Sequence, residues 1–161
     1  MKLSMKLSES LRNIKIHFHY RGISARKILI ADDEPSGIAL LKGLLPKQYK
    51  YLGATDGKTA VELAKKQQPD LILLDVGMPD MDGYEVCCAL KENPATTSIP
   101  VIFQTSPAES EDIAKGFNLG ALDYITKPFR ASELNARVNT QLQLQATKSE
   151  LLRMNAEHRE R

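Results

Sequence analysis

The sequence predicts an α/β fold, in which helices cover both faces of a doubly wound parallel sheet of five strands. Five short aliphatic runs alternate with segments whose apolar residues recur at helical spacing. The connections between them are short, as expected when parallel strands are joined by right-handed helical crossovers. The 161 residues are enough for one domain with its own core and an extension. We therefore expect the strands to end at one shared edge, where open parallel sheets bind their ligands.

The strands are placed by their aliphatic residues and by the polar residues that end them. Residues 71–74 are four consecutive aliphatic residues, typical of a strand buried on both faces, and the acid Asp75 ends them. The run at 27–31 is ended in the same way by Asp32 and Asp33. A charge cannot lie inside such a strand, so these acids belong at carboxyl ends. The remaining strands are expected at 49–54, 99–104 and 121–126.

Turn residues and apolar spacing place four helices between the strands. Pro35 fits the first turn of one helix, and a second is expected at about 58–67. A third follows Asp82-Gly83 and is broken by Asn93-Pro94, and a fourth runs over 111–119. Their inward faces follow the i, i+3, i+4 pattern. The residues expected inward are Ile38, Leu41, Leu44 and Leu45, then Ala60, Val61 and Ala64, then Val86, Cys87 and Leu90, and lastly Ile113, Ala114 and Phe117.

The last segment, 130–161, contains no proline or glycine and is rich in Leu, Gln, Glu, Arg and Ala. As one helix it would extend about 48 Å, well beyond strands of roughly 17 to 20 Å. Its first apolar residues can cover the sheet, and later ones recur at sevens in a thin heptad pattern. We expect a signalling helix that pairs with a second chain or leads to an output domain; the alternative is a solvated, partly frayed tail. The covering residues are Leu134, Val138 and Leu142, and the heptad residues are Leu144, Leu151 and His158, with Thr147 and Met154 between them.

Charge divides the chain into a basic leader and an acidic body. Residues 1–27 hold seven basic residues and one acid, whereas 28–161 hold fifteen basic and nineteen acidic residues. Residues 1–25 are expected to form a basic extension, as a frayed helix or a disordered leader, before a domain at 26–145 and a helical extension at 146–161. The acidic body disfavours direct binding of nucleic acid, which needs a basic face.

The cysteines and the hydropathy of the chain indicate the cellular compartment in which the protein works. Cys87 and Cys88 are adjacent within an expected helix, which is a poor arrangement for a disulfide framework and favours a reducing compartment. No apolar run approaches the length of a membrane span or of a signal-peptide core. The sequence therefore predicts a cytoplasmic protein that does not bind a membrane.

Chemically active residues follow four of the five strands. Asp32 and Asp33 follow the first strand, Asp75 the third, Thr105 the fourth and Lys127 the fifth. Their loops share one sheet edge, so three carboxylates, a hydroxyl and an ammonium group can converge there. Two carboxylates about 4 Å apart repel by roughly 4 kcal/mol at an effective dielectric constant of about 20. A cation must offset that repulsion, and Lys127 together with a magnesium ion, which prefers oxygen ligands and retained waters, would do so.

A carboxylate in such a site can act as a nucleophile on phosphorus and form an aspartyl phosphate. An unperturbed Asp has a pKa of about 3.9, so it is ionised at neutral pH and needs no general base. In this scheme Asp75 attacks, and Asp32 and Asp33 hold the metal. Lys127 binds one phosphoryl oxygen and Thr105 hydrogen-bonds another. Each residue alone also has a structural interpretation, as a helix cap, a strand end or a solvated lysine, but four such coincidences at successive strand ends are far less common.

Three stretches of the sequence resemble the receiver domains of two-component response regulators, and the similarity covers about 26–145. The resemblance implies a flavodoxin-like sheet of order 2-1-3-4-5 and phosphorylation of Asp75 by a histidine kinase or phosphotransfer protein. It also implies that Asp32 and Asp33, with the backbone carbonyl of Gly77, bind magnesium beside Asp75. The three stretches are ILIADDE (28–34), LLDVGMPDMDGYE (73–85) and GALDYITKPF (120–129).

The resemblance further implies a conformational switch. On phosphorylation Thr105 would move toward the phosphoryl group, and Tyr124, at the position of the family's aromatic switch residue, would turn inward behind it. The face made by the fourth helix, the fifth strand and the fifth helix would then change its partners. In this family the bond equivalent to Lys127-Pro128 is expected to be cis, which aims the lysine inward.

Two other functions stay open. One is an interaction module that keeps the fold without the chemistry, but such a module has no need of the complete set of residues at the sheet edge. The other is a hydrolase or phosphatase with an Asp nucleophile, which would need a substrate pocket or cap that these short loops cannot build. The sequence therefore predicts a signalling domain whose only reactions are its own magnesium-dependent phosphorylation and dephosphorylation, with output through the C-terminal helix.

Overall fold

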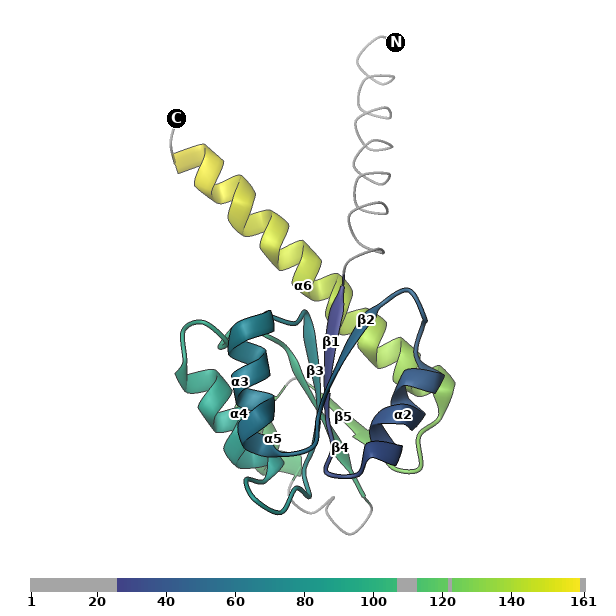
Figure 1. Ribbon diagram of the computed structural model, residues 1–161. Helices are drawn as coiled ribbons and strands as arrows, with labels where there is room; N and C mark the ends of the chain where they lie inside the picture. Colours follow the sequence, from purple (N-terminus) through teal and green to yellow (C-terminus); the bar gives the residue numbers. More distant parts are fainter. Residues whose placement is uncertain (1–25, 107–112, 122, 160–161) are drawn as a thin grey trace, which may run out of the picture.

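The computed structural model describes residues 26–106, 113–121 and 123–159, so the basic leader lies outside the described residues. Strands and helices alternate along the chain and form a central sheet with helices on both sides (Figure 1). The strands are β1 (Lys27–Ala31), β2 (Lys50–Ala54), β3 (Leu71–Asp75), β4 (Val101–Thr105) and β5 (Asp123–Thr126). The helices are α2 (Pro35–Leu44), α3 (Gly57–Gln67), α4 (Gly83–Glu92), α5 (Ile113–Asn118) and α6 (Ala131–Arg159).

All five strands belong to one parallel sheet in the order β2-β1-β3-β4-β5. This confirms the doubly wound α/β sheet that the sequence pattern predicts and the 2-1-3-4-5 order that the resemblance implies. The register places Asp75 of β3 opposite Gln104 of β4, and Thr105 of β4 opposite Thr126 of β5. The strands therefore end together, and the loops that follow them meet at one edge of the sheet.

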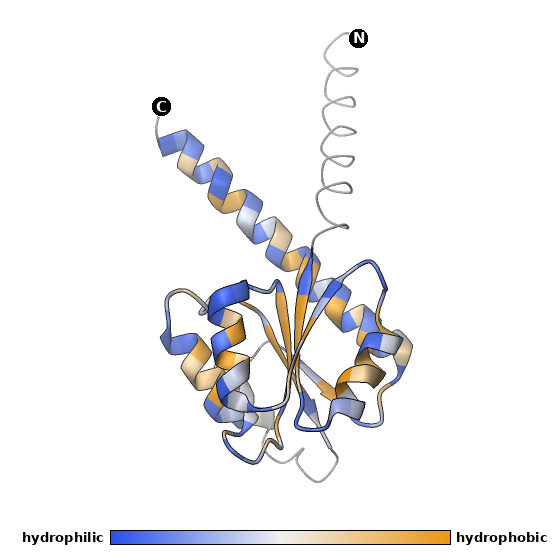
Figure 2. Ribbon diagram, in the orientation of Figure 1, coloured by the Kyte–Doolittle hydropathy of each residue, from blue (hydrophilic) through white to orange (hydrophobic). Residues whose placement is uncertain are grey.

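The core lies on both faces of the sheet. α3, α4 and α5 cover one face, and α2 and α6 cover the other (Figure 1). β3 is buried along its whole length, with Ile72 and Leu74 in one apolar cluster and Leu71 and Leu73 in the other. In Figure 2 the strands are strongly hydrophobic, whereas the helices mix hydrophobic and hydrophilic residues. Each fully buried Leu or Ile contributes about 1.5–3 kcal/mol, so the packing on both faces holds this central strand in place.

The helices begin directly after the strand-end loops because side chains cap their first turns. Asp56 accepts a hydrogen bond from the backbone N–H of Thr59 at the start of α3. Asp82 accepts one from the backbone N–H of Glu85 at the start of α4. Pro35 occupies the first turn of α2, where a missing N–H leaves no helical hydrogen bond unmade. These starts keep the loops at the carboxyl edge of the sheet short.

The inward face of α5 differs from the prediction. Ala114 is exposed and Phe117 keeps 48 % of its surface exposed, whereas Gly116 is buried. α5 has six residues, and Gly116 is the position that lies against Phe103 and Tyr124. Phe117 contacts the ring of Tyr124 from the outer side. Apolar spacing predicts that the bulkier residues face the sheet, but α5 approaches the sheet so closely that only a glycine fits at the contact.

α6 is a single helix of 29 residues and has two parts. In the first, Leu134, Val138 and Leu142 are buried against the sheet, as predicted. In the second, Leu144 and Leu151 are 59 % and 56 % exposed, and the helix continues beyond the edge at which the strands begin (Figure 1). Within the described residues, no helix has the length and apolar character needed to cross a membrane.

Candidate phosphorylation site

Three carboxylates meet at the carboxyl edge of the sheet. Asp75 ends β3, and Asp32 and Asp33 follow β1 directly, so the pairing of β1 with β3 brings them together. One carboxylate oxygen from each lies within 4.8 Å of the others. Asp32 and Asp75 are 2 % and 5 % exposed, whereas Asp33 is exposed. The cluster therefore has a buried side formed by the strand ends and meets solvent at Asp33.

Backbone amides orient the two buried carboxylates. Asp75 Oδ1 accepts a hydrogen bond from the N–H of Gly77 at 3.1 Å. Asp32 Oδ1 accepts one from the N–H of Glu34 at 2.9 Å. Both bonds run from the loop that directly follows the strand. The other oxygen of each carboxylate, Oδ2, is the one that faces Lys127.

Lys127 supplies the positive charge of the site. Its Nζ donates a hydrogen bond to Asp75 Oδ2 at 3.3 Å and lies 3.9 Å from Asp32 Oδ2. The lysine follows β5, and its backbone N–H donates to the carbonyl oxygen of Thr105 at 2.8 Å. The Lys127-Pro128 peptide bond is cis, as the resemblance implies. One ammonium group thus bridges the two buried carboxylates, as its position after the fifth strand predicts.

The electrostatics of the site favour an additional cation. The pKa of Asp32 is raised to about 6, and the largest cause is burial, which removes the water that solvates the carboxylate. The nearby charges of Asp75 and Asp33 also raise this pKa, while the N–H of Glu34 and the ammonium of Lys127 lower it. A single ammonium does not balance three carboxylates. A hard divalent cation that takes oxygen ligands, such as Mg²⁺, fits this donor set.

Thr105 ends β4, one residue after the position opposite Asp75, and Tyr124 lies in β5 opposite Phe103. Thr105 is 1 % exposed, and its hydroxyl donates to the carbonyl oxygen of Ser106 at 3.1 Å. Tyr124 is 8 % exposed, and the centroid of its ring lies 5.5 Å from that of Phe103 and 5.1 Å from that of Phe117. In this structure the Thr105 hydroxyl is therefore engaged locally, and the Tyr124 ring is already turned inward.

Two glycines that no sequence pattern marks as functional shape the site. A Cβ at Gly37 would lie 2.8 Å from Cγ of Asp32, and one at Gly83 would lie 2.8 Å from Cα of Val76. Real Cβ atoms essentially never approach so closely, so only glycine lets α2 and α4 begin this near to the carboxylates. Asp82-Gly83 carries a turn signal in the sequence. Gly37 carries none, because the path of the short loop between β1 and α2 decides how closely the first turn of α2 approaches Asp32.

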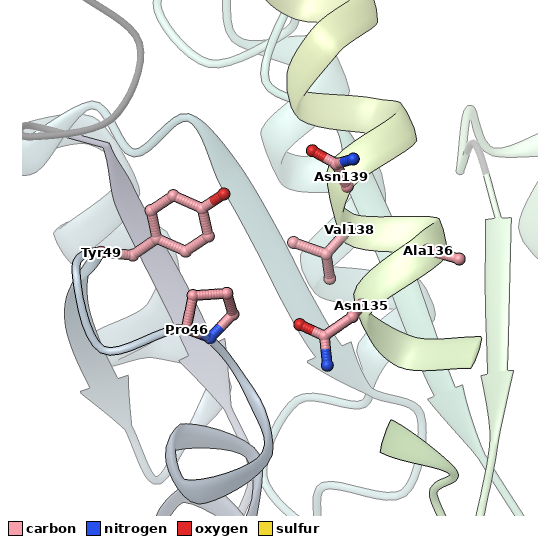
Figure 3. Close-up of a pocket in the computed structure, with 6 residues that line it drawn as sticks. All are labelled: Pro46, Tyr49, Asn135, Ala136, Val138 and Asn139. Atoms are coloured by element: carbon pink, nitrogen blue, oxygen red, sulfur yellow. The ribbon is translucent and has the colours of Figure 1, made fainter. Parts of the chain in front are cut away.

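A separate pocket of about 340 Å³ lies between the loop before β2 and α6 (Figure 3). Asn135 donates from Nδ2 to the carbonyl oxygen of Leu44 at 2.9 Å, so one of its polar groups already serves the packing of α6 on α2. The pocket wall has no carboxylate and no ammonium group, unlike the sheet-edge site. Its lining residues are Pro46, Tyr49, Asn135, Ala136, Val138 and Asn139.

The sequence profile of the response regulator receiver domain matches residues 28–139 of the chain, from β1 to the first part of α6. The chain belongs to this family. Receiver domains are signalling domains of two-component systems, and the five-stranded sheet with its long C-terminal helix is the receiver fold. Receiver domains typically bind Mg²⁺, and this receiver domain has the cluster of acidic residues that such binding needs.

Two relatives are much longer than this receiver domain. A protein of Vibrio cholerae serotype O1 named "Probable cyclic di-GMP phosphodiesterase" is 41 % identical over 152 residues, which are 94 % of this chain and 34 % of that protein. The response regulator PleD of Caulobacter vibrioides is 43 % identical over 119 residues, which are 73 % of this chain and 26 % of PleD. The chain thus spans about a third or less of the length of these two curated relatives.

A solved receiver domain has a similar fold. The receiver domain of the sensor histidine kinase PA1611 from Pseudomonas aeruginosa PAO1 superposes with a TM-score of 0.67 at 28 % identity. The superposition covers 73 % of this chain and 98 % of that one, whose active-site cleft coordinates a magnesium ion. The two chains therefore share the receiver fold over most of this domain.

Proposed function

We propose that this receiver domain accepts a phosphoryl group on Asp75 from a histidine kinase or a phosphotransfer protein, in a magnesium-dependent reaction. The observation that carries the proposal is the convergence of Asp32, Asp33 and Asp75 near the Lys127 ammonium at one edge of the sheet. The phosphodonor brings its own phosphohistidine, so the receiver needs only a nucleophile, a cation site and a positive side chain.

The orientation of Asp75 supports Oδ2 as the nucleophile. Oδ1 is held by the N–H of Gly77, whereas Oδ2 faces Lys127. In the proposed reaction Oδ2 attacks phosphorus, and the bond between phosphorus and the histidine nitrogen breaks. That nitrogen keeps the electron pair, and an acyl phosphate forms on Asp75. Lys127 then pairs with one phosphoryl oxygen, and the hydroxyl of Thr105 hydrogen-bonds another.

Mg²⁺ suits the proposed site because every ligand that the chain offers there is an oxygen atom. Asp32, Asp33 and Asp75 would hold the ion together with the backbone carbonyl of Gly77. The ion supplies positive charge that neutralises the oxygens of the transferring phosphoryl group. The amides of Gly77 and Glu34 already orient the two buried carboxylates, which lowers the cost of organising the site.

We infer that phosphorylation changes the face formed by α5, β5 and α6. The hydroxyl of Thr105 would leave its local hydrogen bond and turn to the phosphoryl group, while the fold already accommodates an inward ring at Tyr124. Arg137 ties α6 to β5 on this face, with its guanidinium 2.6 Å from Asp123 and 3.2 Å from Glu133. A partner that reads the phosphorylation state would therefore meet a surface with both signs of charge.

We further propose that α6 carries the output, by pairing with a second copy or by joining an output module. The alignment with the Vibrio cholerae protein covers 152 residues, more than the 139 that precede the end of the family match, so the similarity continues along α6. Leu144, Leu151 and Met154 are more than half exposed there, at spacings that suit a thin coiled-coil seam. Sedimentation velocity with and without phosphorylation tests the pairing, and a monomer under both conditions would exclude it.

Intact-mass spectrometry tests the phosphoacceptor. The parent, Asp75→Asn and Glu62→Gln, which alters an exposed carboxylate on α3, are each incubated with Mg²⁺ and acetyl phosphate. We expect one added phosphoryl group on the parent and on Glu62→Gln, and none on Asp75→Asn. Chelation of Mg²⁺ should abolish the adduct on the parent. No adduct under conditions that label a known receiver domain would favour an interaction module that works without phosphorylation.

A further inference from the structure

Gln104 of β4 is a buried polar side chain that the phosphorylation chemistry described above does not use. The residue is fully buried, and within the described part of the chain neither the nitrogen nor the oxygen of its carboxamide has a hydrogen-bond partner. Buried polar groups are nearly always paired, because an unpaired one loses its hydrogen bonds to water without replacement. An unpaired amide in the middle of the fold therefore calls for an explanation.

Gln104 lies next to the candidate phosphorylation site. It is opposite Asp75 in the register of β3 and β4, and opposite Ile125 in the register of β4 and β5. Strand alternation puts it on the same face as Ile102, which packs in the cluster beneath α2 and α6. Lys127 follows Ile125 by two residues and leaves β5 on this same face. Because β4 lies between β5 and β3, the lysine must cross β4 near Gln104 to reach Asp75.

We propose that Gln104 is a positioning residue for Lys127, and that its Oε1 accepts a hydrogen bond from the ammonium when Asp75 carries a phosphoryl group. The inference rests on the proposed function of Asp75. An ammonium group has three N–H donors. Among the described residues, the Lys127 ammonium makes one hydrogen bond, to Asp75, and one longer ion pair, to Asp32, so it has donor capacity left.

The pairing differs between the two states because the charges around Lys127 differ. In the unphosphorylated structure Nζ is drawn toward the Oδ2 atoms of Asp75 and Asp32, on the far side of β4 from the strand that carries the lysine. Once Oδ2 of Asp75 is bonded to phosphorus, one N–H of the ammonium pairs with a phosphoryl oxygen instead, and a second N–H can turn toward Gln104. A group that is unpaired in one state and paired in the other biases the equilibrium toward the second.

The test compares Gln104→Met, which keeps the length of the side chain and removes both polar atoms, with Ile102→Met on the same strand and face. Three quantities are measured for the parent and both variants. They are the midpoint of thermal unfolding without ligands, the affinity for Mg²⁺ alone, and the affinity for beryllofluoride, a mimic of the phosphoryl group, in the presence of Mg²⁺. Calorimetry supplies both affinities.

We expect Gln104→Met to raise the midpoint of unfolding by about 3 °C or more, because an unpaired buried amide is removed. Its affinity for beryllofluoride should fall about tenfold, since a hydrogen bond to a charged group is lost. Its affinity for Mg²⁺ alone should stay within about twofold of the parent, because the amide is not a ligand. Ile102→Met should change neither affinity by more than about twofold, since it alters packing alone.

Three results would overturn the inference. A midpoint of unfolding lower for Gln104→Met than for Ile102→Met would mean that the amide is paired in the resting protein. A loss of Mg²⁺ affinity equal to the loss of beryllofluoride affinity would mean that the variant distorts the whole site. Equal beryllofluoride affinities of Gln104→Met and the parent would remove the role of Gln104 while leaving phosphorylation of Asp75 intact. A parent that neither binds beryllofluoride nor gains a phosphoryl group would instead remove the proposed function, and with it this coupling.

Discussion

Asp32 is a carboxylate whose burial and acidic neighbours disfavour its charged form. The side chain is almost completely buried beside Asp75, and burial raises its pKa to about 6. Lys127 offsets part of this cost from 3.9 Å, and the N–H of Glu34 offsets another part. The remaining electrostatic cost lowers the stability of the metal-free protein, and a cation bound at the proposed site would relieve it. We therefore expect Asp32 to raise the affinity for a cation while lowering the stability of the metal-free protein.

We predict that Asp32→Asn makes the metal-free protein more stable at neutral pH. The folded-state pKa of about 6 lies above the ordinary value of 3.8, so between these values the folded state binds more protons than the unfolded state. The free energy of unfolding of the parent therefore falls as the pH rises from about 4 to about 6, and the variant escapes this loss. Its advantage should be near zero at about pH 4 and on the order of 2 kcal/mol above about pH 6.5. Urea unfolding of the parent and the variant at each pH, with a chelator present, measures this difference in the free energy of unfolding.

Glu62→Gln is the control for this prediction. It removes an exposed carboxylate from α3, so its free energy of unfolding should stay within about 0.5 kcal/mol of the parent at every pH. A stability difference between Asp32→Asn and the parent that does not grow with pH would mean that burial does not oppose the charge of Asp32.

Among the elements, α5 packs closely on the sheet because the residue at the contact, Gly116, has no side chain. A Cβ at Gly116 would lie 2.8 Å from the ring of Phe103 and 2.9 Å from the ring of Tyr124. The glycine therefore lets Tyr124 lie inward beneath α5, with Phe117 at its outer edge. Tyr124 belongs to the face that we propose changes on phosphorylation. Gly116 thus sets the distance between α5 and the sheet and also the inward orientation of the Tyr124 ring, which is part of the proposed switch.

We predict that Gly116→Ala displaces Tyr124 outward and lowers the free energy of unfolding by about 1–3 kcal/mol, because the added methyl group overfills the contact. The chain contains no Trp, so tyrosine emission can be read directly. Acrylamide should quench the tyrosine emission of the variant more than that of the parent. The extra quenching should disappear when Tyr124→Phe is added to both proteins, which assigns it to Tyr124.

Gly43→Ala is the matched control. Nothing lies within 4 Å of a Cβ at Gly43 in α2, and alanine favours a helix, so this change should raise the free energy of unfolding by about 0.5–1 kcal/mol. If the two glycine substitutions had the same sign and size, the close contact of α5 with Tyr124 would be refuted.

The elements also show where sequence patterns succeed and where they fail. Every strand lies within one or two residues of its predicted range, because aliphatic runs and the polar residues after them are local signals. The convergence of the acids and Lys127 follows from the same signals, although their roles in phosphoryl transfer stay predictions. The outward side of Phe117, the contact of Gly37 with Asp32 and the unpaired amide of Gln104 could not be predicted. Each depends on how closely two parts of the folded chain approach each other, which residue spacing does not encode.

In the whole molecule, the candidate phosphorylation site and the end of α6 lie at opposite ends of the sheet. The carboxylates lie at the edge at which the strands end, and α6 continues beyond the edge at which they begin (Figure 1). The helix is tied to β5 by the ion pair of Arg137 with Asp123, a few residues from Lys127. A change at the site can therefore reach the far end through one continuous helix.

We predict that Mg²⁺ stabilises the whole domain, because a cation bound only by the folded state shifts the unfolding equilibrium. At a Mg²⁺ concentration 100 times its Kd, the gain in the free energy of unfolding is about 2.7 kcal/mol. Asp32→Asn, the more stable protein in a chelator, should then become the less stable one. Thermal unfolding in Mg²⁺ and in a chelator measures the reversal. NaCl at matched ionic strength controls for screening, and an equal gain with NaCl would argue against a specific site.

Because α6 is one continuous helix, the number of residues in it sets the direction in which a group attached to its end points. An α-helix turns by about 100° and rises about 1.5 Å per residue. One residue inserted after Leu144 would swing everything beyond it by about 100° around the helix axis. Seven inserted residues would restore the direction to within about 20° while moving the same group about 10 Å outward. The length of the projecting half of α6 therefore sets a direction as well as a distance, and the direction is kept to within about 20° only for certain insertions, such as seven or eleven residues.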